Sequence, residues 1–129
     1  MITYMLLLKR KKNMTKAQFR EHYESSHVAL AKKYLGHLFM DYRRHYPVDT
    51  PGFVGEEDRL SNDDESPDAI TKVDFEDKAA FQEFKRLCQQ PHIRDALVAD
   101  EACFLDRERV RTYVCEQVRT WTADDVVKQ

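Results

Sequence analysis

Histidine is the residue of this chain best suited to acid–base chemistry, because the unperturbed pKa of imidazole lies near neutrality. His27 lies within an apolar pattern of helical spacing, His45 lies in an alternating segment, and His92 follows a proline that can begin a helix. Each imidazole could give a proton to a substrate or take one from it. The structural alternatives are a hydrogen-bonded core residue for His27 and a solvated helix terminus for His92. His22 and His37 are interpreted as surface residues.

The segment around His45 carries polar side chains among aromatic ones. If residues 37–46 form a strand, Arg44 and Tyr46 share one face, and the other face carries Arg43 and His45. Such a strand is unusual for a plain core and suits the wall of a polar pocket. One arginine could bind a substrate carboxylate, and Tyr46 could donate a hydrogen bond. Solvation at the surface explains either arginine as well.

Other kinds of chemistry have weaker support. The three candidate histidines come from distant segments and lack the short H-x-x-x-H spacing of a metal site, so we expect neither metal nor cofactor. With only three glycines, the chain has no glycine-rich phosphate loop, and no serine lies in a nucleophile elbow. No two cysteines are spaced as C-x-x-C, which indicates reduced thiols in a cytosolic protein. These cysteines are Cys88, Cys103 and Cys115.

A long amphipathic helix is expected to position His27. Thr15 followed by Gln18 is the signature of a capping box. Behind it, five residues recur at spacings of four, four, three and four, which predicts a helix over residues 16–34. They are Phe19, Tyr23, His27, Leu30 and Tyr34. Gly36 follows where a helix often ends with a residue in the left-handed conformation.

Four strands and two further helices complete the expected fold. Asp77 can cap one helix, and Pro91 can begin a second, short one. The order is the β-α-β-β-α-β pattern of a ferredoxin-like α+β fold. Asp74, on the third strand, could orient a histidine or pair with a basic neighbour. Because the helices cover one face of the sheet, the other face needs a cover, and the simplest is a second copy of the chain. The predicted strands cover residues 2–9, 37–46, 69–75 and 109–118.

The composition indicates one globular domain. Of 129 residues, 42% are apolar and 34% are charged, and the signs nearly cancel to −2, which argues against a nucleic-acid partner. The apolar run at residues 5–8 is too short to span a membrane. No signal peptide is recognisable, so we expect a cytoplasmic location. We assign residues 1–121 to the domain and 122–129 to a polar tail. Residues 47–68 are predicted to form a long acidic loop, either a mobile surface segment or a lid over a cavity.

Two parts of the sequence resemble the EthD domain family. The opening motif comprises LLLKRK at residues 6–11, MTKAQFR at 14–20 and YESSHVALA at 23–31, and the closing motif is DEACFLD at 100–106. The resemblance implies a dimeric α/β barrel, which agrees with the predicted fold. It also implies a role for His27, the last residue of the Y-x-x-x-H piece. It supports His92 too, since cyclases related to the family often carry a histidine at the start of the helix after the third strand.

Within this family, the RRHYP stretch at residues 43–47 resembles a fungal branch linked to aromatic polyketide pathways. Members of that branch are similar to decarboxylases of atrochrysone carboxylic acid. The resemblance therefore implies a cofactor-free lyase that removes CO₂ from a polycyclic aromatic acid. We expect the general acid to be His27, His92 or His45. The expected substrate-binding residues are Tyr23, Arg43, Arg44, Tyr46 and Asp74.

Two alternatives remain open. Related barrels catalyse cofactor-free cyclisation, dehydration and anthrone oxidation of polyketides, and some EthD proteins are accessory components without a defined reaction. The chain could therefore be a polyketide cyclase or dehydratase, an anthrone monooxygenase, or a non-catalytic binding subunit of a polyketide enzyme. For the enzyme, the expected partners are a small aromatic polyketide and a second copy of the chain, with no nucleic acid and no membrane.

Overall fold

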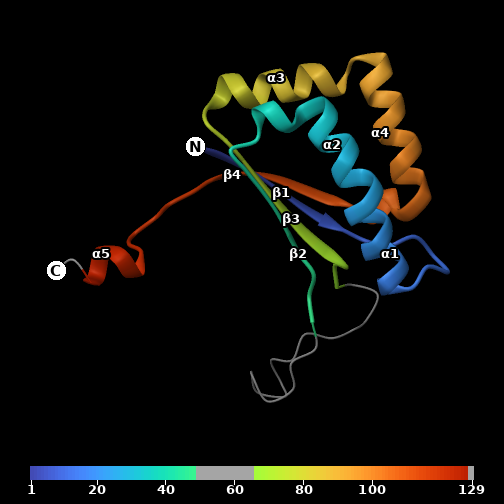
Figure 1. Cartoon of the computed structure of the whole chain (residues 1–129), viewed down its shortest axis with the longest axis horizontal. Helices are drawn as coiled ribbons and strands as arrows, with labels where there is room; N and C mark the ends of the chain where they lie inside the picture. Colours follow the sequence, from blue (N-terminus) through green and yellow to red (C-terminus); the bar gives the residue numbers. More distant parts are fainter. Residues whose placement is uncertain (49–65, 128–129) are drawn as a thin grey trace.

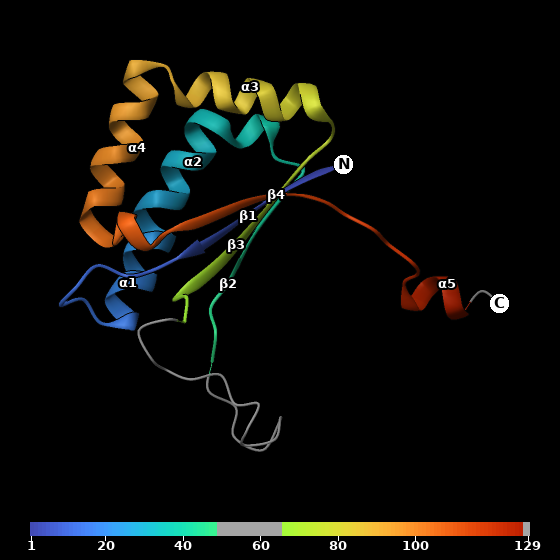
Figure 2. The same cartoon turned by 180° about the vertical axis from the view of Figure 1, so that it is seen from behind.

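One antiparallel sheet of four strands forms the base of the fold (Figure 1). The computed structural model describes residues 1–48 and 66–127. The strands lie in the order β2-β3-β1-β4, with the helices between residues 16 and 104 on one face, and this arrangement confirms the predicted ferredoxin-like α+β fold (Figures 1 and 2). The strand bounds are Ile2–Leu8 for β1, Asp41–His45 for β2, Ala69–Phe75 for β3 and Arg111–Glu116 for β4.

The register of the sheet decides which side chains face the helices. Leu6 of β1 lies opposite Thr71 of β3 and Thr112 of β4. Because successive side chains on a strand point to opposite faces, all three share one face. Their neighbours in the sequence therefore point to the open face. Apolar side chains are among them, including Met5, Leu7, Ile70 and Tyr113.

The predicted helix over residues 16–34 forms as one continuous helical segment with a wide turn in its middle. It consists of α1 (Lys16–His22), a π-helical turn (Tyr23–His27) and α2 (Val28–Leu35). The Thr15 hydroxyl accepts a hydrogen bond from the Gln18 backbone N–H, and the Gln18 side chain accepts one from the Thr15 N–H, so the capping box is confirmed.

The predicted left-handed conformation of Gly36 is wrong. Its φ is −58° and ψ is −29°, because the chain does not reverse there but tightens into a 3₁₀ turn, Gly36–Leu38. The Gly36 N–H still donates to the Lys32 carbonyl, and the Gly36 carbonyl accepts from Phe39. Since this turn occupies residues expected to belong to a strand, β2 begins only at Asp41.

Two more helices complete the layer over the sheet. Asp77 caps α3 (Lys78–Cys88) by accepting from the Ala80 N–H, and Pro91 is the first residue of α4 (Pro91–Phe104). The predicted short length of this helix is wrong, since α4 has 14 residues. Asp100 and Glu101 interrupt its apolar pattern between Val98 and Phe104, because they lie on its inner side. The polar tail holds a short helix, α5 (Ala123–Val127), and residues 49–65 of the predicted acidic loop lie outside the described residues.

Two aromatic clusters hold the layers together, one between helices and one between a helix and the sheet. Phe19 and Tyr23 pack against Phe104 of α4, with ring centroids 5.5 Å apart in both pairs. At the other end of the sheet, the Phe75 ring lies 5.3 Å from Phe81 and 5.1 Å from Phe84. Within the described ranges, no helix is both long and apolar enough to cross a bilayer.

Truncating Phe75 should destabilise the fold strongly. Its side chain is fully buried, so Phe75→Ala is expected to lower the free energy of unfolding by about 3 to 5 kcal/mol. Denaturant unfolding of the variant measures this loss. Met40→Ala, at an exposed apolar residue, is the matched control and should change stability by about 0.5 kcal/mol or less. Equal losses in the two variants would contradict the packing described.

Candidate active site

A cavity of about 550 Å³ lies between the sheet and the helical layer. Its size falls within the range of small-molecule sites, about 300 to 1,000 Å³. Apolar side chains from β1, α2 and α4 make much of its wall, and the cavity is open to solvent on one side. Examples are Leu6, Leu8, Ala31, Leu35 and Leu97. Such a wall suits a flat apolar ligand.

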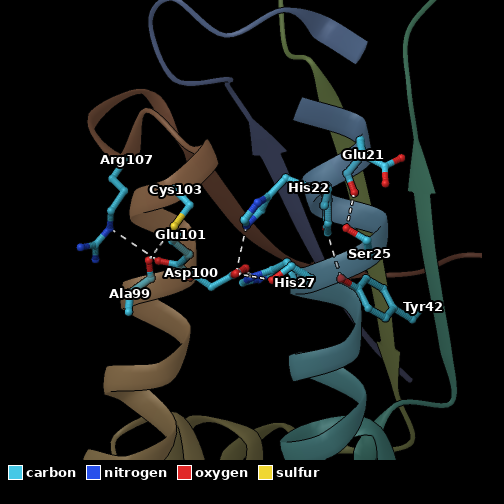
Figure 3. A network of polar contacts seen from close by, with 12 residues as sticks. Glu21, His22, Ser25, His27, Tyr42, Ala99, Asp100, Glu101, Cys103 and Arg107 are labelled. Carbon is cyan, nitrogen blue, oxygen red and sulfur yellow. Dashed lines mark hydrogen bonds and ion pairs between the residues drawn. The ribbon is translucent and has the colours of Figure 1, made fainter. Parts of the chain in front are cut away.

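His27 is the imidazole that lines this cavity. It ends the π-helical turn, and its side chain is only 15% exposed. Its Nδ1 lies 2.9 Å from Oδ2 of Asp100 on α4 (Figure 3). A carboxylate can only accept hydrogen bonds, so Nδ1 carries the hydrogen and Nε2 is left for a ligand. The rings of Tyr23 and Phe104 lie 5.7 and 5.3 Å from the imidazole and fix its plane.

Asp100 holds three side chains of the first helical segment. Besides His27, it accepts a hydrogen bond from the Ser26 hydroxyl at 2.5 Å and one from Nε2 of His22 at 3.0 Å. Partial burial by itself would raise the pKa of the Asp100 carboxyl, but these hydrogen bonds hold it below its ordinary value. Asp100 is therefore a carboxylate that orients His27.

The π-helical turn explains why two histidines reach one carboxylate. His27 lies five positions after His22, which in a regular α-helix would place the two side chains about 140° apart around the axis. A π-helical turn, with i to i+5 hydrogen bonds, is wider and brings them toward one side. His22, predicted to be a surface residue, is instead half-buried and stacks on Phe104.

Three hydroxyl groups form a second polar feature of the cavity wall. The Tyr23 hydroxyl lies 2.5 Å from Oγ1 of Thr71 and 3.2 Å from the Tyr42 hydroxyl. Burial raises the pKa of both tyrosines, so they stay protonated. Two contacts use two of the three hydroxyl hydrogens, so the cluster has a hydrogen left to donate to a ligand oxygen.

The arginines predicted to bind substrate do not line the cavity. Arg44 is held by Glu24, with nitrogen–oxygen distances of 3.0 and 2.6 Å, and the Tyr46 hydroxyl donates to the same carboxylate. Arg43 is exposed and pairs with Asp41 at 2.6 Å. Both arginines therefore pair with carboxylates of the protein itself, although the sequence pattern had suggested that one of them binds a ligand.

Three other candidates also lie away from the cavity. His45 is exposed on β2, and His92 is exposed on the first turn of α4, with its ring centroid 6.1 Å from that of Tyr34. Asp74 is buried on the opposite face of the sheet, where it accepts a hydrogen bond from Thr3 at 2.7 Å and pairs with Lys72 at 3.3 Å. The structure thus brings together Tyr23 and His27 from the predicted set.

Asp100, Tyr42 and Thr71 were not among the predicted site residues. Asp100 belongs to the closing motif, so the signal was present, but its partner His27 lies 73 residues earlier. Burial raises the pKa of the Cys88 thiol to about 11, which leaves it protonated and a poor nucleophile. No cluster of three metal-ligating side chains occurs in the part of the chain that the structure describes.

Comparison with known proteins places this geometry among related folds. The model of the EthD domain matches residues 11–108. A crystal structure of an EthD family protein from Bacillus halodurans is 18% identical, with a TM-score of 0.58, and the match covers 92% of this chain and 100% of that one. No curated protein matches the chain significantly.

Two further solved structures share the fold. A dimeric protein of ferredoxin-like fold from Bacteroides fragilis is 12% identical, with a TM-score of 0.55, covering 90% of this chain and 95% of that one. An antibiotic biosynthesis monooxygenase is 13% identical, with a TM-score of 0.50, covering 92% and 100%. At such low sequence identities, the similarity is evidence for a shared fold alone.

Proposed function

The chain belongs to the EthD domain family, and on that premise we propose that it is a cofactor-free decarboxylase of a polycyclic aromatic polyketide acid such as atrochrysone carboxylic acid. One observation carries the proposal: a histidine oriented by a partly buried carboxylate lines an apolar cavity of ligand size. The reaction consumes one proton for each CO₂ released, so an acid at the reacting carbon is the group it needs most.

The proposed reaction has two steps. The bond between the ring system and the carboxylate breaks, CO₂ leaves, and the electron pair passes to the adjacent carbonyl as an enolate. The hydroxyl cluster of Tyr23, Tyr42 and Thr71 donates a hydrogen bond to this enolate oxygen. His27 acts in its doubly protonated form, with Nδ1–H donating to Asp100. It transfers the proton on Nε2 to the carbon that lost CO₂ and regains a proton from solvent.

The apolar wall assists the first step. A carboxylate is costly to remove from water, whereas CO₂ is not, so an apolar surrounding favours the departure of CO₂. Leu6, Phe39, Leu97 and Val98 supply such a wall, on which fused rings can pack.

We propose that the enzyme is a homodimer in which two sheets pack face to face. The open face carries Met5, Leu7, Ile70 and Tyr113, and the side chain of Tyr113 is half-exposed. The related fold from Bacteroides fragilis is dimeric. Burying this face against a copy would remove apolar surface from water.

The mass in solution tests the dimer. Light scattering is expected to give twice the chain mass of 15.3 kDa, and Met5→Lys together with Tyr113→Lys should give monomers, because each interface would then bury several unpaired charges. A monomeric wild-type protein at micromolar concentration would contradict the face-to-face arrangement.

Incubation of the purified protein with atrochrysone carboxylic acid, with and without a chelator, tests the reaction. We expect CO₂ release above the spontaneous rate, a product with one carbon fewer, and no effect of the chelator. A product of unchanged carbon count would indicate a cyclase or dehydratase, and oxygen consumption would indicate a monooxygenase. Tight binding without turnover would indicate a non-catalytic subunit.

A further inference from the structure

The charged side chains around the cavity are unequal in sign. Lys85, Arg94 and Arg107 line it, and among the residues that the structure describes Glu101 is the one carboxylate that does so. An excess of positive charge around an apolar cavity favours an anionic ligand. The site therefore suits an organic acid, provided that one of these cations is available to bind it.

Glu101 and Arg107 form a loose pair at the cavity. Nε of Arg107 lies 3.5 Å from Oε2 of Glu101, beyond good hydrogen-bond distance. The side chain of Arg107 is 55% exposed and that of Glu101 is 28% exposed. The pair contrasts with Arg44 and Glu24, whose two contacts are both 3.0 Å or shorter. Arg107 is thus held weakly and can exchange its partner.

Glu101 and the imidazole of His27 line the same cavity. Burial raises the pKa of the Glu101 carboxyl, the positive charges of His27 and Arg107 oppose that rise, and the Asp100 carboxylate adds to it. The Cys88 thiol of α3 lines the same cavity. An anion in place of the Glu101 carboxyl would therefore lie beside Arg107, in the cavity that His27 also lines.

We propose that Arg107 binds the carboxylate of an organic-acid ligand and that Glu101 is the counter-ion which this carboxylate displaces. The inference rests on the proposed function for the identity of the acid. The ligand carboxylate takes the position of Glu101 beside Arg107, and the bond to be broken then lies near His27. Once CO₂ has left, the product has no carboxylate, the Glu101–Arg107 pair forms again, and the product is released.

The protonation of Glu101 should control the affinity for the acid. A protonated Glu101 neither repels a ligand carboxylate nor competes for Arg107, whereas an ionised one does both. The ratio of affinities between Glu101→Gln and wild type at each pH isolates the contribution of Glu101, because the other groups that line the cavity are common to both proteins.

Equilibrium binding of two probes tests the proposal without any turnover. The probes are anthraquinone-2-carboxylic acid and uncharged anthraquinone, measured between pH 5 and pH 8. Arg107→Gln should weaken binding of the acid by about tenfold or more, since a charge-assisted hydrogen bond is lost. The affinity for the uncharged probe should not change. Arg94→Gln, at another cation that lines the cavity, is the matched control with a much smaller effect.

Glu101→Gln should bind the acid about threefold tighter than wild type or more at pH 8, and the difference should shrink as pH falls and Glu101 takes up a proton. Weaker binding of the acid by Glu101→Gln, equal losses in Arg94→Gln and Arg107→Gln, or no binding of either probe would overturn the proposal. If the protein shows the expected binding but releases no CO₂, the proposed decarboxylase activity is refuted. The displacement of Glu101 from Arg107 by a ligand carboxylate is then still supported.

Discussion

Replacing His27 by alanine is expected to lower kcat for CO₂ release about 10²- to 10⁴-fold, the range that a positioned general acid contributes. Binding of the substrate should change much less, because the apolar wall and the cations that line the cavity remain. Single-turnover measurements of CO₂ release, alongside binding of anthraquinone-2-carboxylic acid, separate the two effects.

The matched control is His92→Ala. His92 is exposed on α4 and does not line the cavity, so its removal should leave kcat within about twofold, as expected for a surface change. If both variants kept wild-type activity, no histidine of the predicted pair would be the acid. Loss of activity in His92→Ala alone would transfer the role to the first turn of α4.

The second large effect is expected from Asp100→Asn. An amide at residue 100 is uncharged, so it no longer balances the charge of the doubly protonated ring, and it can present N–H instead of an oxygen to Nδ1 of His27. We expect kcat to fall about 10²-fold or more, with little change in the affinity for the acid probe. Asp95→Asn, at an exposed carboxylate of the same helix, should have wild-type activity and serves as control.

The same variant also tests the pH dependence of stability. The pKa of the Asp100 carboxyl is lower in the folded protein than its ordinary value of 3.8, so its charge stabilises the fold above that value and the stabilisation is lost as pH falls through the folded pKa. Denaturant unfolding should show Asp100→Asn less stable than wild type at pH 7, with the difference shrinking in strong acid. A pH-independent difference would contradict this origin.

Short sequence patterns predicted those parts of the fold that depend on residues close together in the sequence. The capping box at Thr15 and the cap at Asp77 need only residues three apart, and both form as expected. The strand β3 was predicted with its observed bounds because its residues combine branched and aromatic side chains. Gly36 shows the limit, since the geometry after a helix depends on where the chain goes next.

The candidate site depends on contacts between distant segments, which one sequence does not show. The helical period placed His27 on the inner face, but its partner Asp100 lies on another helix, and the π-helical turn that brings His22 to the same carboxylate has no recognised sequence pattern. Arg44 looked available until Glu24 proved to hold it. Charge pairing across the fold therefore decides which polar residues can meet a ligand.

A structure of the protein with the decarboxylated product bound tests the central claim most directly. We expect the fused rings to lie in the cavity between sheet and helices, with Nε2 of His27 about 3 to 3.5 Å from the carbon that lost CO₂ and Nδ1 still bound to Asp100. A product bound outside the cavity, or inside it with that carbon beyond the reach of His27, would contradict the proposed mechanism.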